Sequence, residues 1–296
     1  MLILSLDGGG IRGLFTARLI ERLELAVPGW LARVDLFAGT STGGILAAAL
    51  AAGVTPARCV ALYRDNGARI FDASWEQRLG SLFELNGPKY SGAGLRAVLI
   101  ETFGAMRMRE LKRDVLITAC DTMRRELTRF TRQSDPDLPV VEACMRTAAA
   151  EVYFPPVAGR YIDGGNAANN PSLWALIHSL SAGTGLTTSH LLAIGTGNGG
   201  RPPLTVDDWG ARQWLEHGLL DMLFEFPAAL NDRLCAELLG AAYCRLDGAV
   251  DCAMDAIDQL DARLLGPADA LDLAFAITWL EKLDAAGARR AGGGAQ

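Results

Sequence analysis

A serine between glycines lies early in the chain, in the pentapeptide Gly39-Thr-Ser41-Thr-Gly43. The apolar residues 34–38 before it predict a strand, and the small residues 44–52 after it predict a helix. Strand, sharp turn and helix in this order are the setting of a nucleophile elbow, which lifts a serine hydroxyl out of a sheet. The helix start adds free N–H groups and a positive dipole end. We interpret Ser41 as a nucleophile; the alternative is a glycine-rich turn whose serine caps the helix.

A second glycine-rich loop, residues 7–13, reads Asp-Gly-Gly-Gly-Ile-Arg-Gly and lies between a predicted strand, residues 2–6, and a predicted helix, residues 14–26. Consecutive glycines expose backbone N–H groups without side-chain obstruction. Such donors can bind a phosphate or stabilise a tetrahedral oxyanion. Arg12 could hold the loop in place or meet an anionic headgroup.

Nucleotide binding is the alternative use of this loop, because Gly8, Gly10 and Gly13 have the spacing of a dinucleotide-binding fingerprint. In that fold an acidic residue about 20 positions further on follows the second strand. Here the second strand ends in the serine turn instead. A Walker-type phosphate loop also needs a lysine, and none precedes Lys89. We therefore disfavour a nucleotide at this loop.

A catalytic serine needs a base, which is usually a histidine. The three histidines lie in an apolar helix, at the start of a buried strand and on a late helix, outside the glycine-rich loops: His178, His190 and His217. Asp163 is the better candidate, because it follows a short apolar segment and precedes Gly164 and Gly165. A carboxylate at a strand end could face a neighbouring elbow. The alternative is an Asp-Gly turn in which the carboxylate only favours the bend.

The elements around these motifs alternate between strand and helix, which is typical of a mostly parallel sheet covered by helices. Further strands are predicted at residues 114–120, 126–132, 191–194 and 243–246, and further helices at 139–150, 171–180 and, in a mainly helical pattern, from 209 on. We find no internal repeat and no linker. The prediction is one domain over residues 1–284, followed by a disordered tail of Gly, Ala and Arg at 285–296.

Composition narrows the class of partner and the compartment. The net charge of −6 disfavours a nucleic acid polymer as partner and a polybasic membrane anchor. Six cysteines without a CxxC pair indicate a reducing compartment. Neither a signal peptide nor an apolar run long enough to span a bilayer is recognisable. The sequence has no cluster of His and Cys ligands, so it does not predict a metal site. We expect a cytoplasmic protein with, at most, peripheral membrane contact.

Taken together, the motifs resemble those of the patatin-like phospholipase family. Residues 7–13 are similar to its glycine-rich oxyanion loop, residues 39–43 to its nucleophile elbow, and residues 163–165 to its Asp-Gly-Gly motif. Asn169-Asn170-Pro171 trails the last motif as in the family, and residues 88–91, 153–156 and 193–197 also look similar. The motifs follow the family order over roughly residues 1–250.

The resemblance implies an α/β three-layer sandwich with a mostly parallel central sheet, the patatin-like variant of the hydrolase fold. It implies a catalytic dyad of Ser41 and Asp163 without histidine. It further implies an oxyanion hole and supporting motif residues, namely Gly8, Gly9, Gly10 and Arg12, with Asp7, Gly13, Gly39, Gly43, Gly164 and Gly165 in support. The implied reaction is hydrolysis of fatty acyl esters in membrane phospholipids or other acyl lipids, without metal or cofactor.

Regulation and assembly stay open at this point. Some bacterial relatives are effectors held inactive until a protein partner or a cyclic nucleotide engages them, and no motif here favours or excludes either activator, nor a homo-oligomer. A transacylase would use the same acyl-enzyme. A catalytically silent binding protein would be expected to lose its dyad, whereas both residues are present.

A late apolar stripe has two interpretations. Leu215, Leu219, Met222 and Phe226 recur at helical spacing, and aromatic residues lie nearby. We favour a helix that faces the core, because apolar stripes usually do. The alternative is a cap or interfacial helix that admits lipid tails.

Overall fold

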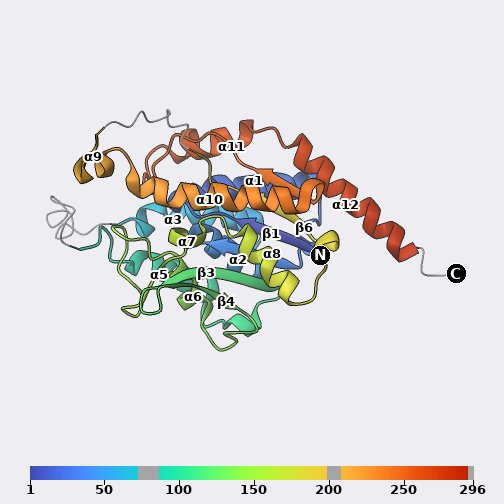
Figure 1. The fold of residues 1–296 in the computed structure, drawn as a ribbon, viewed down its shortest axis with the longest axis horizontal. Coiled ribbons are helices and arrows are strands. Elements are labelled where there is room, and N and C mark those ends of the chain that lie inside the picture. Colours follow the sequence, from blue (N-terminus) through green and yellow to red (C-terminus); the bar gives the residue numbers. More distant parts are fainter. Residues whose placement is uncertain (73–86, 199–207, 293–296) are drawn as a thin grey trace.

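A seven-stranded sheet forms the centre of the computed structural model, which describes residues 1–72, 87–198 and 208–292 (Figure 1). The strand order is β4-β3-β2-β1-β6-β7, and β5 pairs with β3 beside this path. The strands are β1 (Leu2–Leu6), β2 (Leu36–Thr40), β3 (Asp114–Asp121), β4 (Glu126–Thr131), β5 (Tyr161–Asp163), β6 (His190–Ile194) and β7 (Tyr243–Leu246). Strands β3, β2, β1, β6 and β7 are parallel, whereas β4 and β5 are antiparallel to β3.

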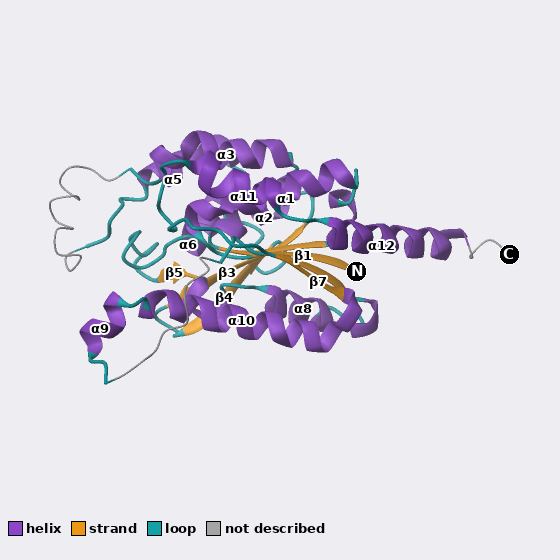
Figure 2. Ribbon diagram, turned by 90° about the horizontal axis from the view of Figure 1, so that it is seen from above, coloured by secondary structure: helices purple, strands orange, loops and turns teal. Residues whose placement is uncertain are grey.

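Helices cover both faces of this sheet and make three layers (Figure 2). They are α1 (Gly13–Ala26), α2 (Thr42–Ala52), α3 (Pro56–Ile70), α5 (Ala93–Phe103), α6 (Val140–Thr147), α7 (Gly165–Ala168), α8 (Ser172–Ser181), α9 (Ala211–Glu216), α10 (Leu219–Leu239), α11 (Gly266–Ala270) and α12 (Ala274–Gly292). In Figure 2, α1, α2, α3 and α11 lie on one side of the sheet and α8 and α10 on the other. This confirms the predicted α/β class with a mostly parallel central sheet.

The apolar sequence of the central strands explains their position between two helical layers. All five residues of β1 are buried, as expected for a strand covered on both faces. Because successive side chains alternate between faces, Leu4 and Leu6 join the larger core on one side of the sheet. Ile3 joins the smaller core under α8 and α10. The sheet is therefore fixed from both sides.

The register along β3 brings two distant segments together. Strand β2 ends at Thr40, which pairs with Thr118 of β3. Strand β5 runs the opposite way and ends at Asp163, which pairs with Ala119, the next residue of β3. Both chains thus end against adjacent positions of one strand. Ser41, which follows Thr40, is consequently placed beside Asp163.

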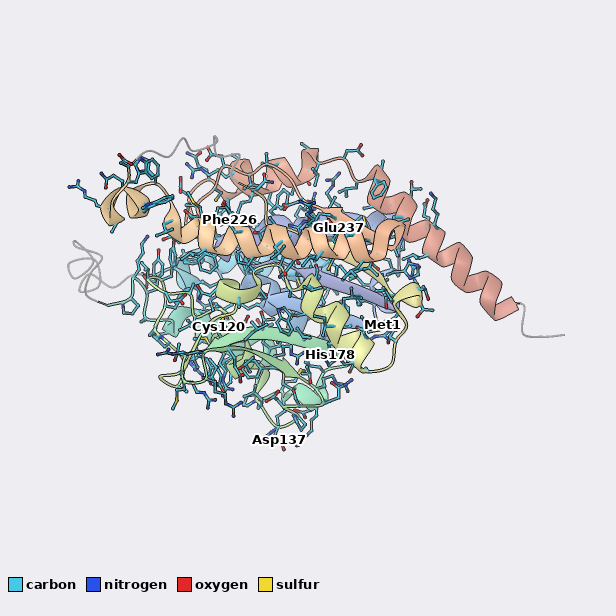
Figure 3. All side chains as sticks on the ribbon, in the orientation of Figure 1. Met1, Cys120, Asp137, His178, Phe226 and Glu237 are labelled. Atoms are coloured by element: carbon cyan, nitrogen blue, oxygen red, sulfur yellow. The ribbon has the colours of Figure 1, made fainter. Side chains whose placement is uncertain are left out.

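The late elements differ from the sequence expectations in one respect. Helix α12 continues to Gly292; residues 293–296 lie outside the described part, and the disordered tail at 285–296 stays a prediction. The stripe containing Phe226 does not face the core as a whole, since Phe226 is 67% exposed on α10 (Figure 3). The buried line of α10 instead contains Asn231, Cys235 and Leu239, which apolar periodicity does not single out. Within the described residues, no helix is long and apolar enough to cross a bilayer.

The elbow is packed so tightly that its glycines have no room for a side chain. A Cβ atom on Gly43 would lie 2.2 Å from the carbonyl oxygen of Leu6 and 2.6 Å from that of Asp7. A Cβ atom on Gly39 would lie 2.1 Å from the carbonyl oxygen of Gly43. Backbone atoms cannot move aside as a flexible side chain can, so these positions fix how closely α2 approaches β1.

We predict that Gly43→Ala lowers the unfolding free energy by about 2 kcal/mol or more, because the added methyl group overlaps the β1 backbone. Urea denaturation measures this loss. The matched control is Gly185→Ala, where the nearest atom is 3.4 Å from the added Cβ and the backbone angles suit alanine. Equal denaturation midpoints for the two variants would contradict the steric argument.

Candidate active site

Ser41 occupies the sharp turn between β2 and α2. Its backbone angles are φ 54° and ψ −123°, a conformation that non-glycine residues rarely adopt. Its N–H donates a hydrogen bond of 2.7 Å to Oγ1 of Thr147, at the end of α6. Helix α2 begins at the next residue, so its unpaired N–H groups and positive dipole end lie beside the serine. This is the geometry of a nucleophile elbow.

Asp163 is buried, with 2% of its surface exposed, and it accepts a hydrogen bond from the Ser41 hydroxyl. The N–H of Gly165 donates a second bond of 2.7 Å to Oδ1 of the same carboxylate. Burial raises the pKa of Asp163 to about 7, while these two hydrogen bonds oppose the rise. The carboxyl group therefore titrates near neutral pH rather than near pH 4.

The glycine-rich loop approaches Ser41 with two of its three candidate donors. Gly9 and Gly10 line the same pocket as Ser41 and Asp163. The N–H of Gly8, by contrast, donates a bond of 3.0 Å to the carbonyl of Asn169. The Gly8 N–H is therefore already used. Of the three predicted oxyanion donors, the N–H groups of Gly9 and Gly10 are left as candidates.

Contacts from later parts of the chain hold this loop. The hydroxyl of Thr196 donates a bond of 2.9 Å to the carbonyl of Gly8. The N–H of Ile11 donates one of 2.8 Å to the carbonyl of Met254. Gly10 has φ +60°, and a Cβ atom there would lie 2.1 Å from the same Met254 oxygen. Glycine is required at this position by both conformation and space.

The pocket at Ser41 is narrow, about 60 Å³, and mainly apolar. Its walls come from several helices and the loops between them: Ile45, Leu62, Tyr63, Ile70, Phe71, Leu95, Ala148, Ala150, Tyr153, Phe154, Phe224 and Met254. Thr42 donates to the hydroxyl of Tyr63 at 2.6 Å, which holds the residue after the nucleophile. An apolar pocket with few polar groups at one end suits a hydrocarbon chain attached to a polar reacting group.

The supporting motif residues have distinct positions. Asp7 directly follows β1 and pairs with Arg245 at 2.6 Å. A Cβ atom on Gly13 would meet Thr42, and one on Gly164 would meet Thr118. Arg12, by contrast, does not line the Ser41 pocket and lines a separate polar cavity instead.

The histidines lie away from this pocket. None of His178, His190 and His217 lines it. His190 packs against Trp279, and His217 packs against Trp209. In the described part of the chain, no group of three or more His, Cys, Asp or Glu side chains is placed to hold a metal ion. Asp163 is the carboxylate that contacts Ser41.

Sequence reasoning missed two residues that position the site, Thr147 and Arg245, and the contact that Asn169 makes. Thr147 supports the elbow from the middle of an alanine-rich stretch and carries no local signal. Asn169 holds Gly8, and its place before Pro171 marks a turn but not this contact. Arg245 contacts both Asp7, at 2.6 Å, and Asp247, at 2.7 Å. It belongs to β7, more than 200 residues after Asp7 in the sequence.

Comparison with known proteins decides the family. The model of the patatin-like phospholipases matches residues 4–176. The chain belongs to the patatin-like phospholipase family. It is accordingly an enzyme of the carboxylic ester hydrolase class, and the resemblance of its motifs is confirmed.

Two curated relatives illustrate the range of this patatin-like family. A cGAMP-activated phospholipase of Pseudomonas aeruginosa is 34% identical, over 83% of this chain and 77% of the relative. Patatin-like protein 1 of Oryza sativa subsp. indica is 29% identical, over 78% of this chain and 68% of the relative. Among solved structures, VipD from Legionella pneumophila matches with a TM-score of 0.51 and 13% identity, covering 95% of this chain and 66% of that chain. The last match supports the fold alone.

We predict that Asp163→Asn stabilises the protein increasingly as pH rises. Between about pH 4 and pH 7 the unfolded chain releases the Asp163 proton while the folded protein retains it, so wild-type stability falls over this range by up to about 4 kcal/mol. Asparagine does not titrate. The difference in unfolding free energy between variant and wild type, measured in urea at pH 4.5 and pH 8, should therefore grow with pH.

Asp121→Asn provides the opposite control for this pH series. Hydrogen bonds from Arg160 lower the pKa of Asp121 to about 2, so its charge stabilises the folded state fully above about pH 4, and this contribution is lost as pH falls towards 2. Its removal should destabilise the protein at pH 8. An Asp163→Asn effect that does not change between the two pH values would contradict the burial argument.

Proposed function

We propose that the protein is a lipid acyl hydrolase of the phospholipase A type, in which Ser41 is the nucleophile and Asp163 the base. The observation that carries this proposal is the hydrogen bond from the Ser41 hydroxyl to a buried carboxylate at the end of an apolar pocket. Family membership supports the ester hydrolase chemistry. The apolar walls support a fatty acyl chain as the group that is released.

The proposed reaction has two halves. Ser41 Oγ attacks the ester carbonyl while its proton passes to the Asp163 carboxylate, and the carbonyl oxygen becomes an oxyanion near the Gly9 and Gly10 amides. The ester C–O bond then breaks, and the proton on Asp163 passes to the leaving alkoxide. Water, deprotonated by Asp163, next attacks the acyl-serine; the bond to Ser41 Oγ breaks, the proton on Asp163 returns to Ser41, and the fatty acid is released. Each lost oxyanion donor would cost about 3 kcal/mol of transition-state stabilisation.

The environment of Asp163 makes a carboxylate usable as the base. A free aspartate, with a pKa of about 4, is too weak a base for efficient proton transfer at neutral pH. A pKa of about 7 places Asp163 near the pH at which a general base works best. Because burial causes this rise, the hydrophobic pocket contributes to basicity as well as to binding.

The surface beside the pocket supports peripheral contact with a membrane. Leu223, Phe226 and Leu230 are at least half exposed and lie at helical spacing on the outer face of α10. Phe224, between the first two, lines the Ser41 pocket. An apolar helix face next to the substrate pocket suits an enzyme whose substrate is in a lipid layer.

We further propose that a cyclic dinucleotide regulates this activity. The specific support is the 34% identical relative, which is named a cGAMP-activated phospholipase. A transacylase would pass the same acyl group to an alcohol in place of water, and product analysis with added alcohol distinguishes it.

We predict that Ser41→Ala and Asp163→Asn each lower hydrolysis of a soluble short-chain ester by about 10³-fold or more, because both residues are needed to form the acyl-enzyme. Ser41→Ala should also abolish labelling by a fluorophosphonate. For the wild type, kcat/KM should rise about tenfold per pH unit below pH 7 and level off above it, since Asp163 must be ionised to act as a base.

Surface substitutions control for non-specific effects on this activity. Ser181→Ala and Asp137→Asn change the same residue types outside the pocket and should retain wild-type rates. A folded Asp163→Asn enzyme with near-normal turnover would refute the dyad. Fluorophosphonate labelling of another serine would refute the nucleophile.

We predict that cGAMP accelerates hydrolysis of phospholipid vesicles at least tenfold over the basal rate, because a ligand that prefers the active state shifts the population toward it. Initial rates with and without the dinucleotide measure this effect. AMP and GMP at equal concentration are the controls. Rates that are unchanged at saturating dinucleotide would argue against this mode of regulation.

A further inference from the structure

A second cavity, of about 430 Å³, is lined by Asp7 and Arg12 of the glycine-rich loop, whose Gly9 and Gly10 line the Ser41 pocket. The carboxyl ends of β1, β6 and β7 form its floor, where residues such as Asp7, Thr196 and Asp247 line it. Helix α10 forms a wall and contributes Glu225, Ala228, Ala229 and Asp232. The two alanines have short side chains, so they leave space between the two acidic side chains.

The two cavities are neighbours in a way that a single lipid could use. Asn169 lines both of them. On α10, Phe224 lines the apolar pocket and the next residue, Glu225, lines the polar cavity. Gly9 lines the Ser41 pocket, and a Cβ atom on it would meet Thr196, which lines the polar cavity. The two cavities therefore have neighbouring walls, one apolar and one polar.

An ion-pair network holds the floor of the polar cavity rigid. Arg245 contacts Asp7 at 2.6 Å and Asp247 at 2.7 Å. The other oxygen of Asp247 accepts the N–H groups of Gly197 and Gly248, each at 2.9 Å. A preorganised floor of this kind loses little entropy when a ligand binds.

Three buried polar atoms of the lining lack a hydrogen-bond partner among the described residues. They are Oδ1 of Asp7, Nε of Arg12 and Nη1 of Arg245. The first is an acceptor and the other two are donors, so they match a ligand that both donates and accepts hydrogen bonds. Leaving such groups unpaired costs about 1–3 kcal/mol each, which a suitable ligand would recover.

The charge of the lining selects among such ligands. Four carboxylates, from Asp7, Glu225, Asp232 and Asp247, face two guanidinium groups, from Arg12 and Arg245. The excess of negative charge disfavours a ligand with a net negative charge. It favours hydroxyl or ammonium groups, which can donate to the carboxylates.

We propose that this cavity binds the polar headgroup of the lipid substrate, and that it selects headgroups that carry hydrogen-bond donors and no net negative charge. Ethanolamine, with its ammonium group, and a neutral sugar, with its hydroxyl groups, both provide this chemistry. This inference rests on the proposed hydrolase function, in which the acyl chain of the same molecule occupies the apolar pocket.

The test measures kcat/KM for acyl-matched lipids in uncharged mixed micelles. The substrates are phosphatidylethanolamine, a monogalactosyl diacylglycerol, phosphatidylcholine and phosphatidylglycerol. We expect the ethanolamine lipid, the galactolipid or both to be cleaved about tenfold faster than the anionic lipid and than the choline lipid, whose cation has no N–H to donate. The faster of the two identifies ammonium or hydroxyl groups as the preferred donors.

A charge-reversed pair of variants shows where this selectivity arises. Glu225→Lys places a cation at the cavity. It should lower the ratio of kcat/KM for phosphatidylethanolamine to kcat/KM for phosphatidylglycerol about fivefold or more. Glu237→Lys makes the same charge change towards the other end of α10, outside the cavity, and should leave the ratio unchanged (Figure 3). Taking a ratio within each enzyme cancels general effects on folding or micelle binding.

Several results would overturn the headgroup subsite. Equal rates for all four lipids, a choline lipid cleaved as fast as both the ethanolamine lipid and the galactolipid, or equal shifts in Glu225→Lys and Glu237→Lys would each do so. Hydrolysis of a soluble ester, measured alongside, tests the proposed function separately. An enzyme that cleaves the ester but treats all headgroups alike keeps the hydrolase function and loses the subsite, whereas one that cleaves neither ester nor lipid loses both.

Discussion

The pairing of two chain ends along β3 is the constraint on which the site depends. Thr40, at the end of the parallel strand β2, and Asp163, at the end of the antiparallel strand β5, pair with adjacent residues of β3. A shift of one residue in either register would turn the side chains to the other face of the sheet. The buried strands around β3 resist such a shift, because their side chains are committed to cores on both faces. Sheet packing thus sets the contact between Ser41 and Asp163.

The same burial that aligns the carboxylate also makes it costly. A buried carboxylate is disfavoured in its charged form, and among the described residues the Ser41 hydroxyl and the Gly165 N–H offset this cost. The strained backbone of Ser41 adds a second cost. Hydrogen bonds from Thr147 and around Asn169 hold both segments despite these penalties. Stability and chemistry are therefore in opposition at this point of the fold.

Much of this arrangement could be predicted from local sequence, because glycine-rich turns between apolar runs have few structural solutions. The turn at Ser41, the loop at residues 7–13 and the alternation of strand and helix in the early elements follow from such patterns. The hydrogen bond from the Gly8 N–H to the Asn169 carbonyl could not be predicted, because it depends on two loops meeting in space. The role of Arg245 depends likewise on a distant strand pairing with β6. The exposed face of α10 was misjudged, since helical periodicity reveals an apolar stripe but not which side of the helix faces the protein.

The construction of the site from backbone atoms has a consequence for how such an enzyme can change over evolutionary time. At Gly9, Gly10, Gly39 and Gly43 even a methyl group would collide with a neighbour, so a larger residue at these positions would force the surrounding atoms to shift. Gradual adaptation to new lipids is therefore confined to the walls of the two cavities, and α10 contributes to the walls of both. A helix that tolerates substitution beside a centre that does not is an arrangement in which substrate range can diverge among relatives while the reaction is preserved.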